Sequence, residues 1–134
     1  MKTLVLLTLL FFYGLPHQIS WKNAKDWRIY KMPSYIGLRV SLDSLPAYKY
    51  KSLDIDRMSI FLKNLQEIKN INPVWTGLYV ASCELDNKKR KLLFSRYGGF
   101  FFDESSKSYY QIPENLRQEW IDFLNESSKS IDQN

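Results

Sequence analysis

The stretch WTGLYVASCELDNKKRKLLFSRYGGFFFDESSKSYYQI, residues 75–112, is rich in the aromatic, β-branched and aliphatic residues that favour β-strands. Two polar clusters, residues 86–89 and 104–107, divide it, and both contain residue types that occupy tight turns. The connections are short enough for β-hairpins. The stretch therefore predicts an antiparallel meander of three strands, which the rest of the chain has to cover.

Two adjacent glycines, Gly98 and Gly99, interrupt the second strand of this meander near its middle. Paired glycines inside a strand are typical of a bulge or a bend, because they let the ribbon coil sharply. We expect a kink in a continuous strand at this point.

Two amphipathic helices flank the meander. The first is predicted over residues 54–69, with Asp54 as its N-cap and with Asn70 and Pro73 ending it. Its apolar stripe consists of Ile55, Met58, Phe61, Leu62, Leu65 and Ile68. The second begins at Pro113, a residue favoured at the first helical position. Its stripe consists of Leu116, Trp120, Ile121, Phe123 and Leu124.

The remaining segments give weaker patterns. Residues 36–42 alternate apolar and other residues, which predicts a strand with one buried face. Residues 17–35 predict an extended lead-in, with one helical turn over residues 24–30 as an alternative. Residues 127–134 are polar and are expected to form a disordered tail.

The order of these elements predicts the fold class. A strand, a helix, a three-strand meander and a C-terminal helix indicate an α+β fold, in which a curled antiparallel sheet packs against helices. A chain of 134 residues suits one domain, which we expect over residues 21–126. The element order resembles the cystatin-type architecture, although no matching inhibitory motif accompanies it. The resemblance implies a fold and carries no function.

The N-terminus has the composition of an export signal. Lys2 precedes an apolar run over residues 4–13, which Gly14 and Pro16 end. The run is shorter than the roughly 20 apolar residues that a membrane span needs. We therefore expect residues 1–20 to be a signal peptide or an N-terminal apolar anchor, and the protein to be extracytoplasmic, either secreted or periplasmic. The alternative is an intracellular regulatory domain that buries this segment.

The charge balance is mildly basic. Lys and Arg number 19 against 14 Asp and Glu, which gives a net charge of +5. The basic residues are scattered, apart from one run over residues 88–91 at a predicted hairpin tip, where solvated or edge-protecting charge is expected. The glycine spacing in residues 96–102 does not match the aromatic strand motif of RNA-recognition domains. No nucleic-acid partner is predicted, and membrane association is expected only through an uncleaved leader.

Several chemistries are excluded by residue counts. His17 is the only histidine in the sequence and falls in or beside the leader, which excludes Ser-His-Asp triads, Cys-His pairs and His-based zinc sites in the mature domain. Cys83 is the only cysteine, so no intramolecular disulfide can form, and we expect it to be a small buried hydrophobe. No phosphate-binding glycine motif is present. We therefore predict no catalytic residue, no metal site and no cofactor.

One enzymatic alternative remains, a small hydrolase that uses paired carboxylates, or Ser95 with a neighbouring lysine. The acid pairs close in sequence are Glu84 with Asp86, Asp103 with Glu104, and Asp54 with Asp56. Each of these acids also suits a turn, a helix cap or a solvated surface. Two acids that converge in a concave pocket would support the hydrolase.

The leading hypothesis comes from the run of phenylalanines at residues 100–102. Consecutive strand residues point to opposite faces, so at least one ring must leave the main core. The second face is either covered by residues 116–124 or by the lead-in, or it is a partner-binding patch. The residues predicted for such a patch are Arg96, Tyr97, Phe101 and Tyr109. We therefore expect a small exported binding module that is not an enzyme and that presents a sheet face or a hairpin tip to a protein or another extracytoplasmic ligand. An inhibitor or immunity-type role would suit such a module. The sequence makes no prediction of oligomeric state.

Overall fold

The structure, a computed structural model, describes residues 19–73, 75 and 78–132. Its strands are β1 (Lys25–Tyr30), β2 (Tyr50–Ser52), β3 (Gln66–Ile68), β4 (Leu78–Leu85), β5 (Lys88–Ser95), β6 (Phe100–Asp103) and β7 (Ser108–Gln111). Its α-helices are α2 (Ser34–Gly37), α3 (Ile55–Leu62) and α4 (Arg117–Asp132). Three 3₁₀ turns, η1 (Trp21–Asn23), η2 (Leu42–Ala47) and η3 (Glu114–Leu116), complete the described elements.

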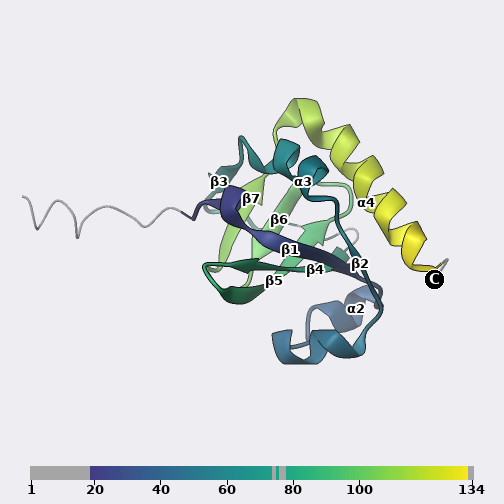
Figure 1. Ribbon diagram of the computed structural model, residues 1–134. Helices are drawn as coiled ribbons and strands as arrows, with labels where there is room; N and C mark the ends of the chain where they lie inside the picture. The colour runs from purple at the N-terminus through teal and green to yellow at the C-terminus, as the bar shows by residue number, and fades with distance from the viewer. Residues whose placement is uncertain (1–18, 74, 76–77, 133–134) are drawn as a thin grey trace, which may run out of the picture.

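In the described residues, the seven strands form one open antiparallel sheet in the order β2-β1-β4-β5-β6-β7-β3. Helices α3 and α4 lie on one side of the sheet, and the segment that carries α2 lies on the other (Figure 1). The predicted α+β class with a curled antiparallel sheet is therefore confirmed.

The face of the sheet below α3 and α4, which we call the inner face, carries the main core. Trp120 of α4 is fully buried, and its ring centroid lies 5.1 Å from that of Phe61 on α3 and 5.0 Å from that of Phe94 on β5. Phe94 in turn lies 5.8 Å from Phe101 on β6. This chain of rings joins both helices to the centre of the sheet.

The opposite, outer face is covered over β1, β4 and β5 by residues 31–49, which include α2 and η2. A second apolar cluster lies beneath this cover and consists of Tyr30, Val40, Leu45, Leu78, Val80 and Leu93. The prediction that residues 116–124 cover this face is wrong, because they pack on the inner face as part of η3 and α4. The predicted lead-in contributes its last residues, 31–35, to the outer cover, whereas residues 25–30 form strand β1 and Trp21 packs in the inner core.

The hairpin between β4 and β5 turns at Asp86 and Asn87, within the cluster predicted as a turn. Both residues have left-handed backbones, with φ of 54° and 63°. Two consecutive left-handed residues are the pattern of a type I′ turn, whose twist matches that of the flanking strands. Leu85 and Lys88 pair directly across this two-residue loop.

The meander has four strands, because Gly98 and Gly99 form a turn and not a kink. The chain reverses between β5 and β6, which pair with each other. Gly99 has a φ of +67°, and a Cβ on Gly98 would overlap the ring of Phe100 and crowd the Ser95 hydroxyl. The Gly98 N–H donates to Ser95 Oγ at 2.8 Å. Both glycines are therefore required by a tight reversal, which the prediction of a continuous strand missed.

The predicted helix over residues 54–69 ends early, at Leu62. Asp54 caps it as expected, since its Oδ1 accepts from the backbone N–H of Asp56 at 2.9 Å and of Arg57 at 3.1 Å. Residues 66–68 instead form β3, which pairs with β7 at the edge of the sheet. The free edge of β7 offers these residues backbone hydrogen bonds that local periodicity cannot reveal.

Two further segments differ from the prediction. The lead-in forms the internal strand β1, which pairs with both β2 and β4, and its single helical turn is η1, ahead of residues 24–30. The strand predicted at residues 36–42 is replaced by α2 and η2. Gly37 lets this segment approach the sheet, because a Cβ there would lie 2.6 Å from Val80 Cγ2.

The polar C-terminal segment is helical, so the prediction of a disordered tail from residue 127 is wrong. Helix α4 continues to Asp132. Ser127 is 8% exposed and its hydroxyl donates to the Phe123 carbonyl at 2.8 Å, while Ile131 is 2% exposed and belongs to the inner core. One apolar residue two turns beyond the predicted end of the stripe is enough to dock the last turns of the helix.

Replacement of Ile131 by alanine tests this docking. We expect Ile131→Ala to lower the free energy of unfolding by about 2 kcal/mol or more, because it leaves a cavity under the end of α4. The matched control is Lys129→Ala, an exposed position on the same helix, which should change stability by less than about 0.5 kcal/mol. Urea unfolding followed by circular dichroism measures both, and equal stability of the two variants would contradict the docking.

Candidate functional site

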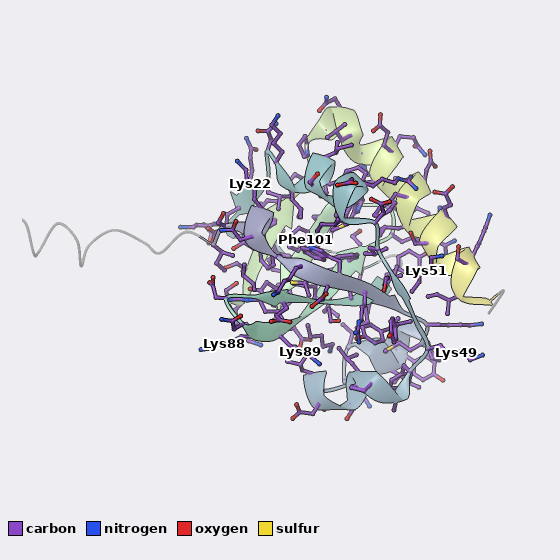
Figure 2. All side chains as sticks on the ribbon, in the orientation of Figure 1. Lys22, Lys49, Lys51, Lys88, Lys89 and Phe101 are labelled. Carbon is purple, nitrogen blue, oxygen red and sulfur yellow. The ribbon has the colours of Figure 1, made fainter. Side chains whose placement is uncertain are left out.

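Phe101, one of the four residues predicted to bind a partner, is buried in the inner core. It is 0% exposed, and its ring lies 5.3 Å from Trp21 and 5.3 Å from Tyr110. Figure 2 shows it in the interior, while the labelled lysines lie at the periphery. The prediction that Phe101 faces a partner is wrong, because the β6 register turns this ring, and not its neighbours, towards the helices.

Arg96 and Tyr97 lie in the turn between β5 and β6, beside α4. The Arg96 Nε donates to the Asn125 side-chain oxygen at 3.3 Å, and its guanidinium lies 5.2 Å from the Tyr97 ring. The carbonyl of Tyr97 accepts two hydrogen bonds from Arg117, at 3.1 and 2.8 Å. The Tyr97 ring is 45% exposed. Arg96 and Tyr97 thus connect the turn to α4 through hydrogen bonds, and the Tyr97 side chain remains partly exposed to solvent.

Tyr109, the fourth predicted residue, lies on the outer face among aromatic side chains that are only half-buried. Ring centroids lie 4.6 Å apart for Phe102 and Tyr109, 5.1 Å for Trp75 and Phe100, and 6.4 Å for Trp75 and Tyr109. We call these four residues the outer aromatic patch. The structure therefore divides the predicted residues among three places, and only Tyr109 belongs to this patch.

The expectation that one of the three consecutive phenylalanines leaves the main core is confirmed, since Phe100 and Phe102 belong to the patch. Trp75 was not predicted as part of it, although it begins the stretch that decided the fold. Alternation along β6 could have suggested Phe100 and Phe102 in place of Phe101, but the face that the helices cover is set by tertiary packing. Strand periodicity alone is symmetric between the two faces.

The patch continues the part of the outer face that α2 and η2 cover. Trp75 and Phe102 pack against the outer apolar cluster, as does Ile36 of α2. Two of the most exposed apolar side chains, Tyr35 at 74% and Leu38 at 52%, lie on and just after α2. The outer layer thus covers the sheet incompletely and adds apolar surface of its own.

Three of the six acids proposed for a carboxylate pair have separate structural partners. Asp54 caps α3, Asp103 pairs with Arg90, and Glu104 pairs with Lys91 at 2.9 Å. Ser95, the candidate nucleophile, is 1% exposed and accepts the Gly98 N–H. The described contacts of these residues support structural roles for them.

The pair of Arg90 and Asp103 is the most buried ionic contact described. Arg90 Nη1 donates to Asp103 Oδ2 at 2.6 Å, and the same oxygen accepts from the hydroxyl of Ser106 at 2.6 Å. Asp103 is 0% exposed, while its Oδ1 and the Arg90 Nε are buried without a hydrogen-bond partner among the described residues. Because the pair is internal, it fixes the β5–β6 ladder to the following turn and offers no accessible carboxylate.

The largest hollow described lies at the end of the inner face and has a volume of about 480 Å³. Its lining is chemically mixed and consists of Ile19, Ser20, Trp21, Lys22, Leu62, Lys63, Leu65, Glu67, Ser106, Ser108 and Tyr110. Burial raises the pKa of the Tyr110 phenol. This hydroxyl therefore stays protonated at neutral pH and can act as a hydrogen-bond donor at the margin of the hollow.

Cys83 is buried in the inner core, as expected, with 2% exposure. Burial and the nearby Asp103 carboxylate raise the pKa of its thiol to about 12. The thiolate is the reactive form of cysteine, so this thiol is unreactive at neutral pH.

Two features of the described residues bear on ligand and membrane classes. No group of three or more His, Cys, Asp or Glu side chains that could hold a metal ion is present in residues 19–73, 75 and 78–132. No helix in the same described part is long and apolar enough to cross a membrane. The predicted leader, apart from Ile19 and Ser20, and the single histidine lie outside the described residues.

Comparison of the chain with models of known protein families, with curated proteins and with solved structures finds no match.

The burial of Cys83 leads to a test with two readouts. Near pH 8, we expect a disulfide reagent such as DTNB to leave the native thiol unmodified and to react fully in denaturant. Because folding raises the pKa of the Cys83 thiol, the native thiol keeps its proton at pH values at which the unfolded thiol has lost it. Between the ordinary pKa of 9.0 and about 12, rising pH should therefore lower the stability of the wild type relative to Cys83→Ala. Rapid labelling of the folded protein near pH 8 would contradict the assignment.

Proposed function

We propose that the chain is a small exported binding module, without catalytic activity of its own, that recognises a protein through the outer aromatic patch. The observation that carries this proposal is the set of four half-buried rings, Trp75, Phe100, Phe102 and Tyr109, on a sheet face that the outer layer leaves partly open. Contiguous exposed apolar surface on a small protein is typical of interaction sites.

A protein partner fits the composition of this surface. Aromatic side chains provide large, rigid contact area and are enriched among the residues that dominate protein–protein affinity. The patch is already ordered by its own ring contacts, so little side-chain entropy is lost on binding. Lys107, whose ammonium lies 6.0 Å from the Phe102 ring, adds a positive charge at the margin. We therefore expect a partner with an apolar contact surface bordered by acidic residues.

Export rests on the composition of the N-terminus, where Lys2 precedes an apolar run over residues 4–13. Trp21, the first residue after the predicted leader, is 4% exposed and packs edge-on against Phe101 and Tyr110. Ile19 contributes only a partly buried side chain to this core. Cleavage after residue 20 would leave the Trp21 anchor in the mature chain.

The patch is tested with a double variant, Phe100→Ser with Tyr109→Ser. Binding material comes from the extracytoplasmic fraction of the source organism, and the affinity for each retained protein is then measured by surface plasmon resonance. We expect the double variant to lose roughly thirtyfold or more in affinity, as for removal of a dominant contact. The matched control is Tyr50→Ser, which alters a ring that is 43% exposed on β2 and should bind as the wild type does. Unchanged affinity of the double variant would exclude the patch as the interface.

Export is tested by N-terminal sequencing of the protein recovered from the medium and from the cell envelope. We expect the mature chain to lack residues 1–20 and to begin at or next to Trp21. Recovery of the whole population in the cytosol with an intact Met1 would contradict export, whatever the result of the binding experiment.

A further inference from the structure

A small cavity lies on the outer face between η2 and strands β1, β4 and β5. Its volume is about 60 Å³, against the roughly 10–15 Å³ that one water molecule requires. It is lined by Asp26, Arg28, Tyr30, Leu42, Leu45, Pro46, Ser82, Cys83, Glu84 and Lys89. A cavity of this size suits a ligand of a few non-hydrogen atoms, with polar groups on the strand side and aliphatic groups on the η2 side.

The strand register places opposite charges next to one another along the floor of this cavity. Arg28 on β1 stands opposite Ser82 on β4. Glu84 follows two residues further along β4 on the same face, about 6.6–6.8 Å away, and stands opposite Lys89 of β5. Lys89 lies at the end of the β4–β5 hairpin, beside Lys88 (Figure 2). The floor of the cavity therefore carries both charge signs, with Glu84 between Arg28 and Lys89 in the register.

The two half-buried charges of the cavity, Arg28 and Glu84, have no ionic partner among the described residues. The Arg28 guanidinium stacks on the Tyr50 ring, 4.3 Å from its centroid, and Glu84 lies between strands. Among the described residues neither of them forms an ion pair, whereas Arg90 and Lys91 nearby both do. A partly buried charge interacts more strongly with an opposite charge than it would in bulk water. Both groups are thus available to a ligand.

Two buried hydroxyls complete the polar side. Tyr30 Oη and Ser82 Oγ lie 2.9 Å apart, and both residues are less than 8% exposed. When two hydroxyls bond each other, one donates, and the O–H of the acceptor stays free to donate elsewhere. A carboxylate beside Arg28 can accept this remaining proton.

We infer that this cavity binds a free α-amino acid with a small side chain, in its zwitterionic form. The ligand carboxylate pairs with Arg28 and the hydroxyl pair, its ammonium pairs with Glu84, and its small aliphatic side chain contacts Leu42 and Leu45. The lining carries two acidic and two basic side chains. A ligand with a single charge would be attracted by one of these pairs and repelled by the other, whereas a zwitterion can pair with both. The site lies apart from the outer aromatic patch, and the inference does not depend on it.

The test uses alanine as the probe, titrated into the full folded chain while backbone amide shifts are followed by NMR. We expect saturable shifts at Arg28, Ser82 and Glu84, with a Kd below about 10 mM. N-acetylalanine, which lacks the positive charge, and alaninamide, which lacks the negative charge, should each bind at least about tenfold more weakly. Arg28→Gln and Glu84→Gln should each weaken alanine binding by at least about tenfold, while Lys88→Gln, a lysine outside the lining, should bind as the wild type does.

Three results would overturn the inference. The first is the absence of saturable shifts with alanine, glycine and serine up to about 10 mM. The second is equal binding of alanine and its acetylated or amidated forms. The third is an equal loss of binding in Lys88→Gln and in the two cavity variants. Unfolding curves identify a variant with a damaged fold, and the remaining cavity variant together with the two blocked probes then decides the outcome.

Discussion

The packing of Trp120 against Phe61 and Phe94 is the contact on which the rest of the structure depends. The indole is fully buried between α4, α3 and the sheet, and its ring contacts extend through Phe94 to Phe101. Burial of large aromatic side chains contributes more to stability than burial of any other residue class. Once this contact fixes which face of the sheet meets the helices, strand alternation assigns every other side chain to the inner or the outer face.

Both candidate sites follow from that assignment. In the part of the chain that the structure describes, two helices close the inner face, whereas residues 31–49 cover part of the outer face. This cover leaves the rings of the outer aromatic patch half-exposed at one side and closes a small polar cavity under η2 at the other. The part of the molecule with the weakest sequence pattern therefore shapes the surfaces that can meet a ligand.

The buried pair of Arg90 and Asp103 shows why proximity in sequence did not identify function. Asp103 and Glu104 are adjacent, yet they point to opposite faces and pair with Arg90 and Lys91 respectively. Removing one partner of a buried pair typically costs about 3–5 kcal/mol, because the other charge is left unpaired in the interior. Such a pair is accounted for by the register of β5 and β6 and does not require a catalytic role.

The sequence by itself determined the α+β class, the turn at Asp86 and Asn87, the cap at Asp54 and the burial of Cys83. Each of these depends on local backbone preference or on the type of one side chain. Tertiary structure alone decided that residues 66–68 pair with β7, that residues 31–49 cross the outer face, and that Ile131 holds the end of α4. It also decided that Phe101 faces inward while Phe100 and Phe102 do not, because a strand pattern of period two is the same on both faces until a partner layer covers one of them.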